Sequence, residues 1–238
     1  MEETEWLFSA NPTEMFKVLA GHKDRRKLHL FAVACARTVQ HHMLDARSIN
    51  ALEVMERLIE GQATDAERVA AIHEAWRASE EARDTKDLAT AAACDAAYRA
   101  INISSYSVAN SGMRAASRAT GKRAAVATVR ATAYGHQAML IRDIFGNPFQ
   151  TKNLRSIWIH QCKRVLLWNS ATVLAIAQSI YAEKCWDQLP ILADAMEDAG
   201  CTVQPMLQHL RGPGPHARGC WVVDTIRGKD PVSPGYQP

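Results

Sequence analysis

The chain has 238 residues, 47% of them hydrophobic, so it can bury a sizeable core in one large domain or two modest ones. Lysine and arginine number 28 against 25 acidic residues, and the resulting charge of +3 neither favours nor excludes an anionic partner. Six scattered cysteines without a C-x-x-C pair argue against a small disulfide-linked scaffold.

The first residues, MEETEWLFSANP, are acidic and lack the basic and apolar segments of a signal peptide. The most apolar stretch, 165–180, is interrupted by Asn169, Ser170 and Gln178, and it is too short and too polar to span a bilayer. We therefore expect a cytoplasmic protein with reduced cysteines and no membrane partner.

Helix start signals recur through the first 65 residues. Asn11-Pro12 opens a helix, because Asn caps helix N-termini and Pro is tolerated at the first helical position. Asp24 and Asp45 can cap two further helices, and Gly61 can end the second of these.

The next start is the most specific one in the chain. Thr64 and Glu67 form an S/T-x-x-E capping box, in which the side chain of each residue bonds the backbone of the other. The apolar face of the helix that follows is expected at Val69, Ile72 and Trp76.

Residues 88–133 are rich in alanine, the strongest helix former, and contain no proline. Small side chains let helices approach closely, so we expect a tightly packed helical hairpin that breaks at Gly112 or Gly121. A further long helix runs toward Ile144 and stops at Gly146-Asn147-Pro148, and residues 146–156 are expected to form a connecting loop.

Helical patterns continue to the C-terminal region. Asn169 or Ser170 can cap one helix, and Gly200 can end another that starts near Leu189. The polar, proline-rich segment 229–238 predicts a disordered tail.

Strand signals are almost absent, so the sequence predicts an all-α fold. We expect an antiparallel helical array with a long Ala-rich helical hairpin in an N-terminal region, residues 1–150. A smaller C-terminal helical lobe, residues 151–228, and the tail 229–238 complete the chain.

Four potential metal ligands lie within 20 residues near the C-terminus, namely Cys201, His209, His216 and Cys220. Zinc takes four such ligands tetrahedrally, and the Gly-Pro-Gly-Pro turn at 212–215 can fold the two halves of the set together. The spacing C-x7-H-x6-H-x3-C differs from the common zinc-finger patterns. The alternative is that the cysteines pack as small hydrophobic residues and the histidines satisfy local polar groups.

A catalytic interpretation of the same segment uses His216, Cys220 and Asp224, which would share one face of a continuous helix. A nucleophilic cysteine needs a base within hydrogen-bond reach, but such groups normally converge from separate elements. We therefore assign no catalytic residue.

A basic row at helical spacing is formed by Arg114, Arg118 and Lys122, and Arg123 and Arg130 follow it. Such a row can follow a phosphate backbone, which makes nucleic acid a candidate partner. The alternative is a solvated outer helix face, because the net charge is only +3 and aromatic residues for base stacking are sparse here.

Several short segments together carry a resemblance: EWL near the start, KLHLFAVACAR at 27–37, RDIFGNPF at 142–149, LPILADAMEDAGC at 189–201 and GPHARGCWVVD at 214–224. The chain resembles a family of bacterial Ala-rich helical proteins with a C-terminal G-P-H-x-R-G-C-W-like motif. That family has no established activity, so the resemblance implies a helical fold and draws attention to His216, Arg218, Gly219, Cys220 and Trp221.

Motifs of the common nucleotide-binding and hydrolase frameworks are missing, including G-x-x-x-x-G-K-[ST], G-x-S-x-G and H-E-x-x-H. The sequence therefore favours a non-enzymatic helical interaction or scaffold protein whose partner is another protein. Structural zinc at the C-terminal Cys/His set is one alternative function, and nucleic-acid binding through the basic row is another.

Overall fold

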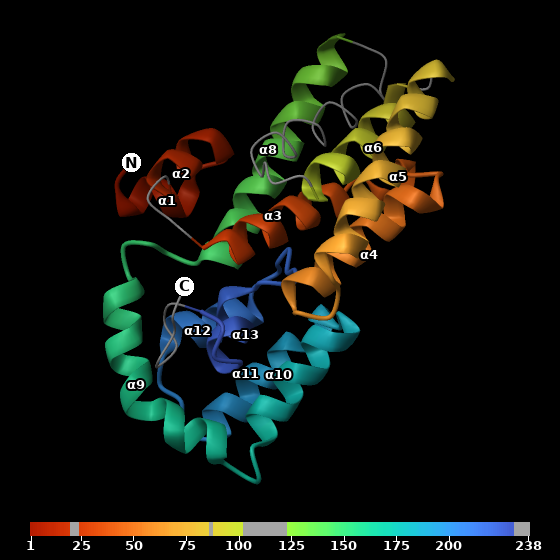
Figure 1. The fold of residues 1–238 in the computed structure, drawn as a ribbon. Coiled ribbons are helices and arrows are strands. Elements are labelled where there is room, and N and C mark those ends of the chain that lie inside the picture. Colours follow the sequence, from red (N-terminus) through yellow and green to blue (C-terminus); the bar gives the residue numbers. More distant parts are fainter. Residues whose placement is uncertain (20–23, 86–87, 102–122, 231–238) are drawn as a thin grey trace. The chain divides into compact units, whose positions relative to one another are not determined.

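The computed structural model describes residues 1–19, 24–85, 88–101 and 123–230 (Figure 1). Within these residues all regular structure is helical and no strand occurs, which confirms the predicted all-α class. The described residues form two compact units: residues 1–8, 15–19 and 141–230 make up the first unit, and residues 9–14, 24–85, 88–101 and 123–140 make up the second.

The second unit contains α3 (Arg25–Arg37), η2 (Gln40–His42), α4 (Ala46–Ile59), α5 (Asp65–Asp84), α6 (Leu88–Ile101) and the larger part of α8 (Arg123–Phe145). The first unit contains α1 (Glu3–Phe8), the larger part of α2 (Pro12–Val18), the last turn of α8, α9 (Thr151–Leu167), α10 (Thr172–Glu183), η3 (Trp186–Gln188), α11 (Leu189–Asp198), α12 (Gln204–Arg211) and α13 (Trp221–Ile226).

The helices of the second unit start at the predicted caps. The Asp24 carboxylate accepts the backbone N–H of Lys27, and the Asp45 carboxylate accepts that of Arg47. Thr64 and Glu67 form the complete capping box at the start of α5. Side-chain acceptors thus satisfy backbone N–H groups that the first helical turn leaves without partners.

Helices α4 and α5 pack side by side, and both also pack against α6. The pair is antiparallel, because Arg47 near the start of α4 forms ion pairs with Glu74 and Glu81 in the later part of α5. Helix α6 contributes an alanine face to this core, made of Ala91, Ala92, Ala93, Ala96, Ala97 and Ala100. The predicted hairpin breaks at Gly112 and Gly121 lie outside the described residues.

The apolar face predicted for α5 is wrong. Its buried residues are all small: Ala71, Ala75, Ala78, Ser79 and Ala82. Val69 and Trp76 are 40% and 48% exposed, and Ile72 is half-buried. Small side chains allow close packing against α4 and α6, so the alanines rather than the large apolar residues face the core.

In the first unit, α9 begins at Thr151, so the predicted loop 146–156 ends six residues earlier than expected. The predicted cap at Asn169 or Ser170 is also wrong. The N-cap of α10 is Ala171, and Asn169, Ser170 and Ala171 all have positive φ angles, of 45°, 59° and 65°. This left-handed turn bends the chain by 92° between α9 and α10 and delays the helix start.

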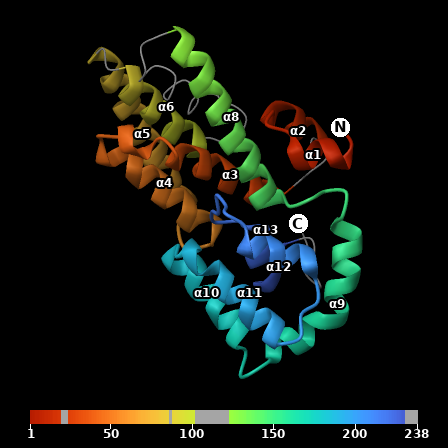
Figure 2. The ribbon, with the colours of Figure 1, turned by 180° about the vertical axis from the view of Figure 1, so that it is seen from behind.

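Figures 1 and 2 show α12 and α13 between α9 and α10. Their shared core includes Trp158 of α9, Ile180 of α10, Met196 of α11 and Val223 of α13, each fully buried. As predicted, Gly200 follows the end of α11, with a φ of +84°, and the N–H of Cys201 bonds the carbonyl of Met196 at 2.9 Å.

Among the described helices, none taken singly has the length and apolar character needed to cross a membrane; the bent pair α9 and α10 meets that test only when taken together. The domain boundary expected at residue 150 and the tail expected at 229–238 stay predictions, and residues 231–238 lie outside the described part of the chain.

Candidate metal centre

Asp143 lies in the last turn of α8, between the buried residues Ile141 and Ile144, and is 2% exposed. The helix ends two residues later, and Gly146 turns the chain away with a φ of +66°. A buried carboxylate costs folding free energy unless it is paired and hydrogen-bonded. The groups that pair with Asp143 must therefore stabilise this buried carboxylate.

Those partners come from the segment between α12 and α13. His209 lies on α12, two residues before the helix ends, and Cys220 is the N-cap residue of α13. His216 lies in the loop between them, which Gly214 folds back tightly with a φ of +76°. A Cβ at Gly214 would stand 3.0 Å from the backbone nitrogen of His216 and 3.1 Å from its ring. Only glycine fits this turn.

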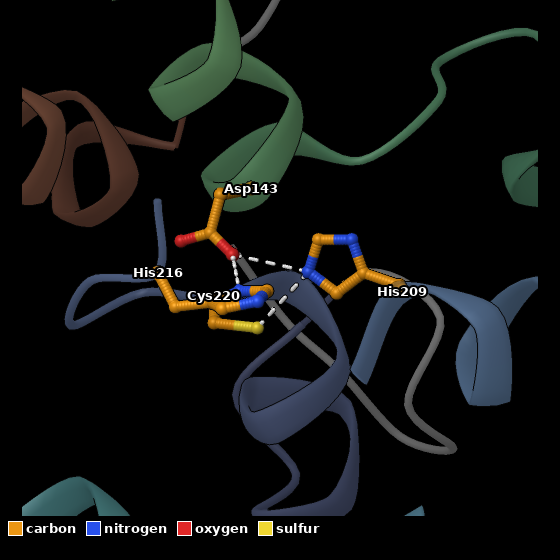
Figure 3. Close-up of side chains that lie close together, drawn as sticks. All are labelled: Asp143, His209, His216 and Cys220. Atoms are coloured by element: carbon orange, nitrogen blue, oxygen red, sulfur yellow. Dashed lines mark hydrogen bonds and ion pairs between the residues drawn. The ribbon is translucent and has the colours of Figure 1, made fainter. Parts of the chain in front are cut away.

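The four side chains converge on one point (Figure 3). The Oδ1 atom of Asp143 lies 2.7 Å from Nδ1 of His216 and 3.0 Å from Nε2 of His209. The same Nε2 atom of His209 lies 3.3 Å from Sγ of Cys220. One donor atom from each of the four residues can be chosen so that all lie within 4.8 Å of one another.

Backbone groups hold two of these side chains in place. The N–H of Ala217 donates to Oδ2 of Asp143 at 2.9 Å, on the side away from the histidines. Nε2 of His216 lies 3.3 Å from the carbonyl oxygen of Gly212, to which its N–H can donate. That bond leaves Nδ1 of His216 as the nitrogen that faces the cluster, the arrangement in which outer hydrogen bonds orient metal-binding histidines.

Burial, hydrogen bonds and charges within the cluster shift the pKa values of Asp143, His216 and Cys220. Burial raises the pKa of Asp143, but hydrogen bonds to His209 and His216 outweigh it, and the pKa lies below its ordinary value. Burial lowers the pKa of His216, but the hydrogen bond and charge of Asp143 outweigh it, and the pKa lies above its ordinary value. Burial, and then the charge of Asp143, raise the pKa of Cys220 well above its ordinary value.

This geometry does not suit a cysteine nucleophile. A base in such a site uses one ring nitrogen for the nucleophile and the other for the orienting carboxylate. Here the single Nε2 atom of His209 faces both Asp143 and Cys220. Cys220 is also fully buried, and its raised pKa keeps the thiol protonated at neutral pH.

The same geometry suits a cation at the shared point. Tetrahedral zinc with ordinary ligand bond lengths places neighbouring N, O and S donors roughly 3.3 to 3.6 Å apart. The contacts of 2.7 and 3.0 Å between nitrogen and oxygen atoms are shorter than this range, and the 3.3 Å contact between nitrogen and sulfur lies at its lower end. Side-chain movements that bring all four donor atoms, which lie within 4.8 Å of one another, to this spacing would convert the hydrogen-bonded cluster into a coordination shell.

Three of the four residues proposed from the sequence as metal ligands thus lie together: His209, His216 and Cys220. Cys201 does not belong to the group. It follows the turn at Gly200 and packs into the apolar core of the first unit, where burial raises the pKa of its thiol. Asp143 takes the fourth place.

The helical alignment considered for His216, Cys220 and Asp224 does not occur. Helix α13 begins only at Trp221, so His216 lies in the preceding loop. Asp224 is fully buried and forms an ion pair with Arg227 at 3.2 Å.

The basic row proposed for nucleic acid is not described by the structure. Arg114, Arg118 and Lys122 lie outside the described residues, and for Arg123 and Arg130 only the backbone, at the start of α8, is described. The nucleic-acid hypothesis stays a prediction.

Asp143 was missed because it lies 66 residues before His209, beyond the reach of any spacing rule. One local signal marks it: an acidic side chain in the last turn of a helix opposes the helix dipole, and here the apolar residues Ile141 and Ile144 lie close to it in the chain. Such a residue needs a compensating partner.

Comparison with models of protein families, with curated proteins and with solved structures gives no match.

Proposed function

We propose that this chain is a non-enzymatic helical protein whose first unit is held together by one zinc ion bound to Asp143, His209, His216 and Cys220. The observation that carries the proposal is the convergence of four donor atoms, all within 4.8 Å, from α8, α12, the following loop and the N-cap of α13. Metal bound there would tie segments separated by up to 77 residues.

The donor set favours zinc over other cations. Calcium and magnesium prefer shells of oxygen ligands, and this site offers one carboxylate beside two imidazoles and a sulfur. Zinc accepts all three ligand types in four-coordinate sites. The two histidines and one carboxylate alone resemble the iron triad, but Cys220 fills a position which that triad leaves open.

A structural role fits the site better than a catalytic one. Catalytic zinc keeps a coordination position for water, whereas four protein ligands complete a tetrahedral shell. Asp143 and Cys220 are buried, and the side chain of His216 is only 8% exposed. The zinc would thus contribute to the folding free energy of the first unit.

The decisive experiment is elemental analysis of protein purified without added metal. It compares the wild type with a His216→Ala/Cys220→Ala double variant and with Cys201→Ala as the matched cysteine control. The proposal expects about one zinc per chain in the wild type and in Cys201→Ala, and none in the double variant. A wild type that carries no zinc and takes up none on addition of zinc would overturn it.

We propose protein interaction as the role that this scaffold serves, and α5 supplies the supporting observation. Trp76 and Val69 lie exposed on one side of this helix, while Ala71, Ala75, Ala78 and Ala82 are buried. Clustered exposed apolar residues are typical of binding surfaces. A protein that the wild type captures specifically in a pull-down should not be captured by Trp76→Glu. Arg77→Glu, at the exposed neighbouring position, is the control and should still capture it. Equal capture by both variants would contradict this role for α5.

A further inference from the structure

A cavity of about 410 Å³ lies beside the metal centre, wholly within the first unit. Its walls come from α1, the end of α8, the start of α9, α12 and α13. This volume falls in the range of roughly 300 to 1,000 Å³ that is typical of small-molecule sites. His209 is the one ligand of the proposed zinc that also lines the cavity.

The apolar part of the lining combines two tryptophans, Trp6 and Trp221, with Leu7, Leu154 and Pro205. Trp221 is 6% exposed and packs against Gly146, where a Cβ would stand 3.2 Å from its ring. Trp6 is fully buried, and Leu154 is 5% exposed. The two indole rings give the cavity a surface suited to a flat apolar group.

The polar part of the lining has one full charge. Arg142 lies one residue before Asp143, and its Nε donates to the carbonyl oxygen of Trp6 at 3.0 Å, which fixes the guanidinium. No Asp or Glu is among the described residues that line the cavity. Burial lowers the pKa of Arg142, yet arginine stays charged at neutral pH, so a partly desolvated cation faces this space.

Amide side chains of the lining already hold a carboxylate. Nδ2 of Asn147 donates to Oε1 of Glu3 at 2.8 Å, and Nε2 of Gln150 donates to the same oxygen. Glu3 itself does not line the cavity. Amide donors beside a fixed guanidinium match the acceptor pattern of a carboxylate.

We propose that this cavity binds a small organic carboxylate with a flat apolar body, its charged end toward Arg142 and its body on Trp221 and Leu154. The site goes beyond the proposed zinc centre and does not require that the metal be bound, because Arg142, Trp221 and Leu154 are not metal ligands.

The test uses the purified full chain and two probes of the same shape, phenylacetate and its uncharged counterpart phenylacetamide. Binding is measured by titration calorimetry and by ligand-observed NMR. Gln208, exposed on α12, lines the cavity, and Gln208→Trp fills it from the rim. Gln204→Trp places the same side chain on the same helix, at an exposed position outside the lining.

The wild type and Gln204→Trp should bind phenylacetate with a Kd below about 1 mM and bind phenylacetamide at least about tenfold more weakly, because only the acid pairs with the guanidinium. Gln208→Trp should lose both ligands, and Arg142→Gln should lose the preference for the acid. Equal affinity for acid and amide in the wild type, no detectable binding, or unchanged binding in Gln208→Trp would overturn the proposal. If Arg142→Gln does not fold, the comparison of Gln208→Trp with Gln204→Trp still tests whether the ligand binds in this cavity.

Discussion

Nδ1 of His216 lies 2.7 Å from Oδ1 of Asp143, although 73 residues separate them in the chain. Asp143 belongs to the last turn of α8, and His216 to the loop before α13. Their contact is therefore the point at which the segment from α9 to α13 closes back on the end of α8 (Figure 3).

Replacing Asp143 by Asn should sharply reduce zinc binding. The variant keeps an acceptor for the N–H of Ala217 but removes the negative charge that faces His209 and His216. We expect at least a 100-fold loss of zinc affinity, since changes even outside the ligand shell cost about 10- to 100-fold. Competition with a chromophoric chelator measures this loss.

Asp194→Asn is the matched control for Asp143→Asn. Asp194 also pairs with a basic side chain, Arg211, but it lies exposed on α11, away from the cluster. Its zinc affinity should equal that of the wild type. Equal affinities in all three proteins would remove Asp143 from the site.

Substitution of the two buried cysteines of the C-terminal segment should affect zinc binding differently. Cys220→Ala removes the sulfur ligand, so zinc should be lost or bound far more weakly. Cys201→Ala truncates a core side chain and should cost about 1 kcal/mol of stability while zinc stays stoichiometric. Metal analysis combined with urea unfolding resolves the pair, and zinc loss from both variants would restore Cys201 to the ligand set.

Much of this site could be inferred from sequence, but not its composition. His209, His216 and Cys220 lie close enough in the chain for their density to be noticed. Cys201 has the same ligand chemistry and the same proximity, yet the turn at Gly200 directs it into the core. Residue type and spacing cannot distinguish these two fates, because tertiary packing decides between them.

Removing metal should destabilise the first unit selectively. If the free zinc concentration is about 100 times the Kd, zinc contributes about 2.7 kcal/mol, which for a unit of this size corresponds to a fall in Tm of roughly 10 to 20 °C on chelation. Five of the six tryptophans, at positions 6, 158, 168, 186 and 221, lie in this unit, so tryptophan fluorescence reports its unfolding. The His216→Ala/Cys220→Ala variant should show no response to chelator, and an equal response there would point to zinc bound elsewhere.

Zinc affinity should rise with pH. The raised pKa of Cys220 keeps its thiol protonated in the metal-free protein, and the raised pKa of His216 extends its protonation toward neutral pH. Zinc must displace these protons, whereas the lowered pKa of Asp143 leaves that carboxylate ionised. Between pH 6 and 8 we expect about a tenfold gain in affinity per pH unit for each proton released.

Calorimetry in buffers of different ionisation enthalpy counts the protons released on zinc binding. One or two per zinc would fit this account. An affinity that does not change with pH would contradict a thiolate ligand.

Gly146→Ala should destabilise the first unit more than Gly228→Ala. Both glycines have positive φ angles, of +66° and +75°, so alanine is strained at either position. At Gly146 the new Cβ would also meet the Trp221 ring at 3.2 Å, whereas nothing lies within 4 Å at Gly228. We expect an extra loss of about 1 to 2 kcal/mol at Gly146 in urea unfolding. Equal losses of unfolding free energy in the two variants would show that the Trp221 ring can move to accommodate the new Cβ.

The helical fold was more accessible to sequence reasoning than its packing. Helix ends were predictable where they depend on local hydrogen bonds and local backbone angles. This holds for Asp24, Asp45, the Thr64 and Glu67 capping box and Gly200. The exposed side of α5 was not predicted correctly, because the prediction assumed that the largest apolar residues are buried. Alanine-based packing against α4 and α6 reverses that rule, and Trp76 remains on the surface.

The most direct test of the central claim is zinc X-ray absorption spectroscopy on the full chain. One sulfur at about 2.3 Å and three nitrogen or oxygen neighbours at about 2.0 to 2.2 Å are expected for Asp143, His209, His216 and Cys220. The sulfur should vanish in Cys220→Ala and persist in Cys201→Ala. A shell with two sulfurs or none, or a wild type that holds no zinc, would contradict the account.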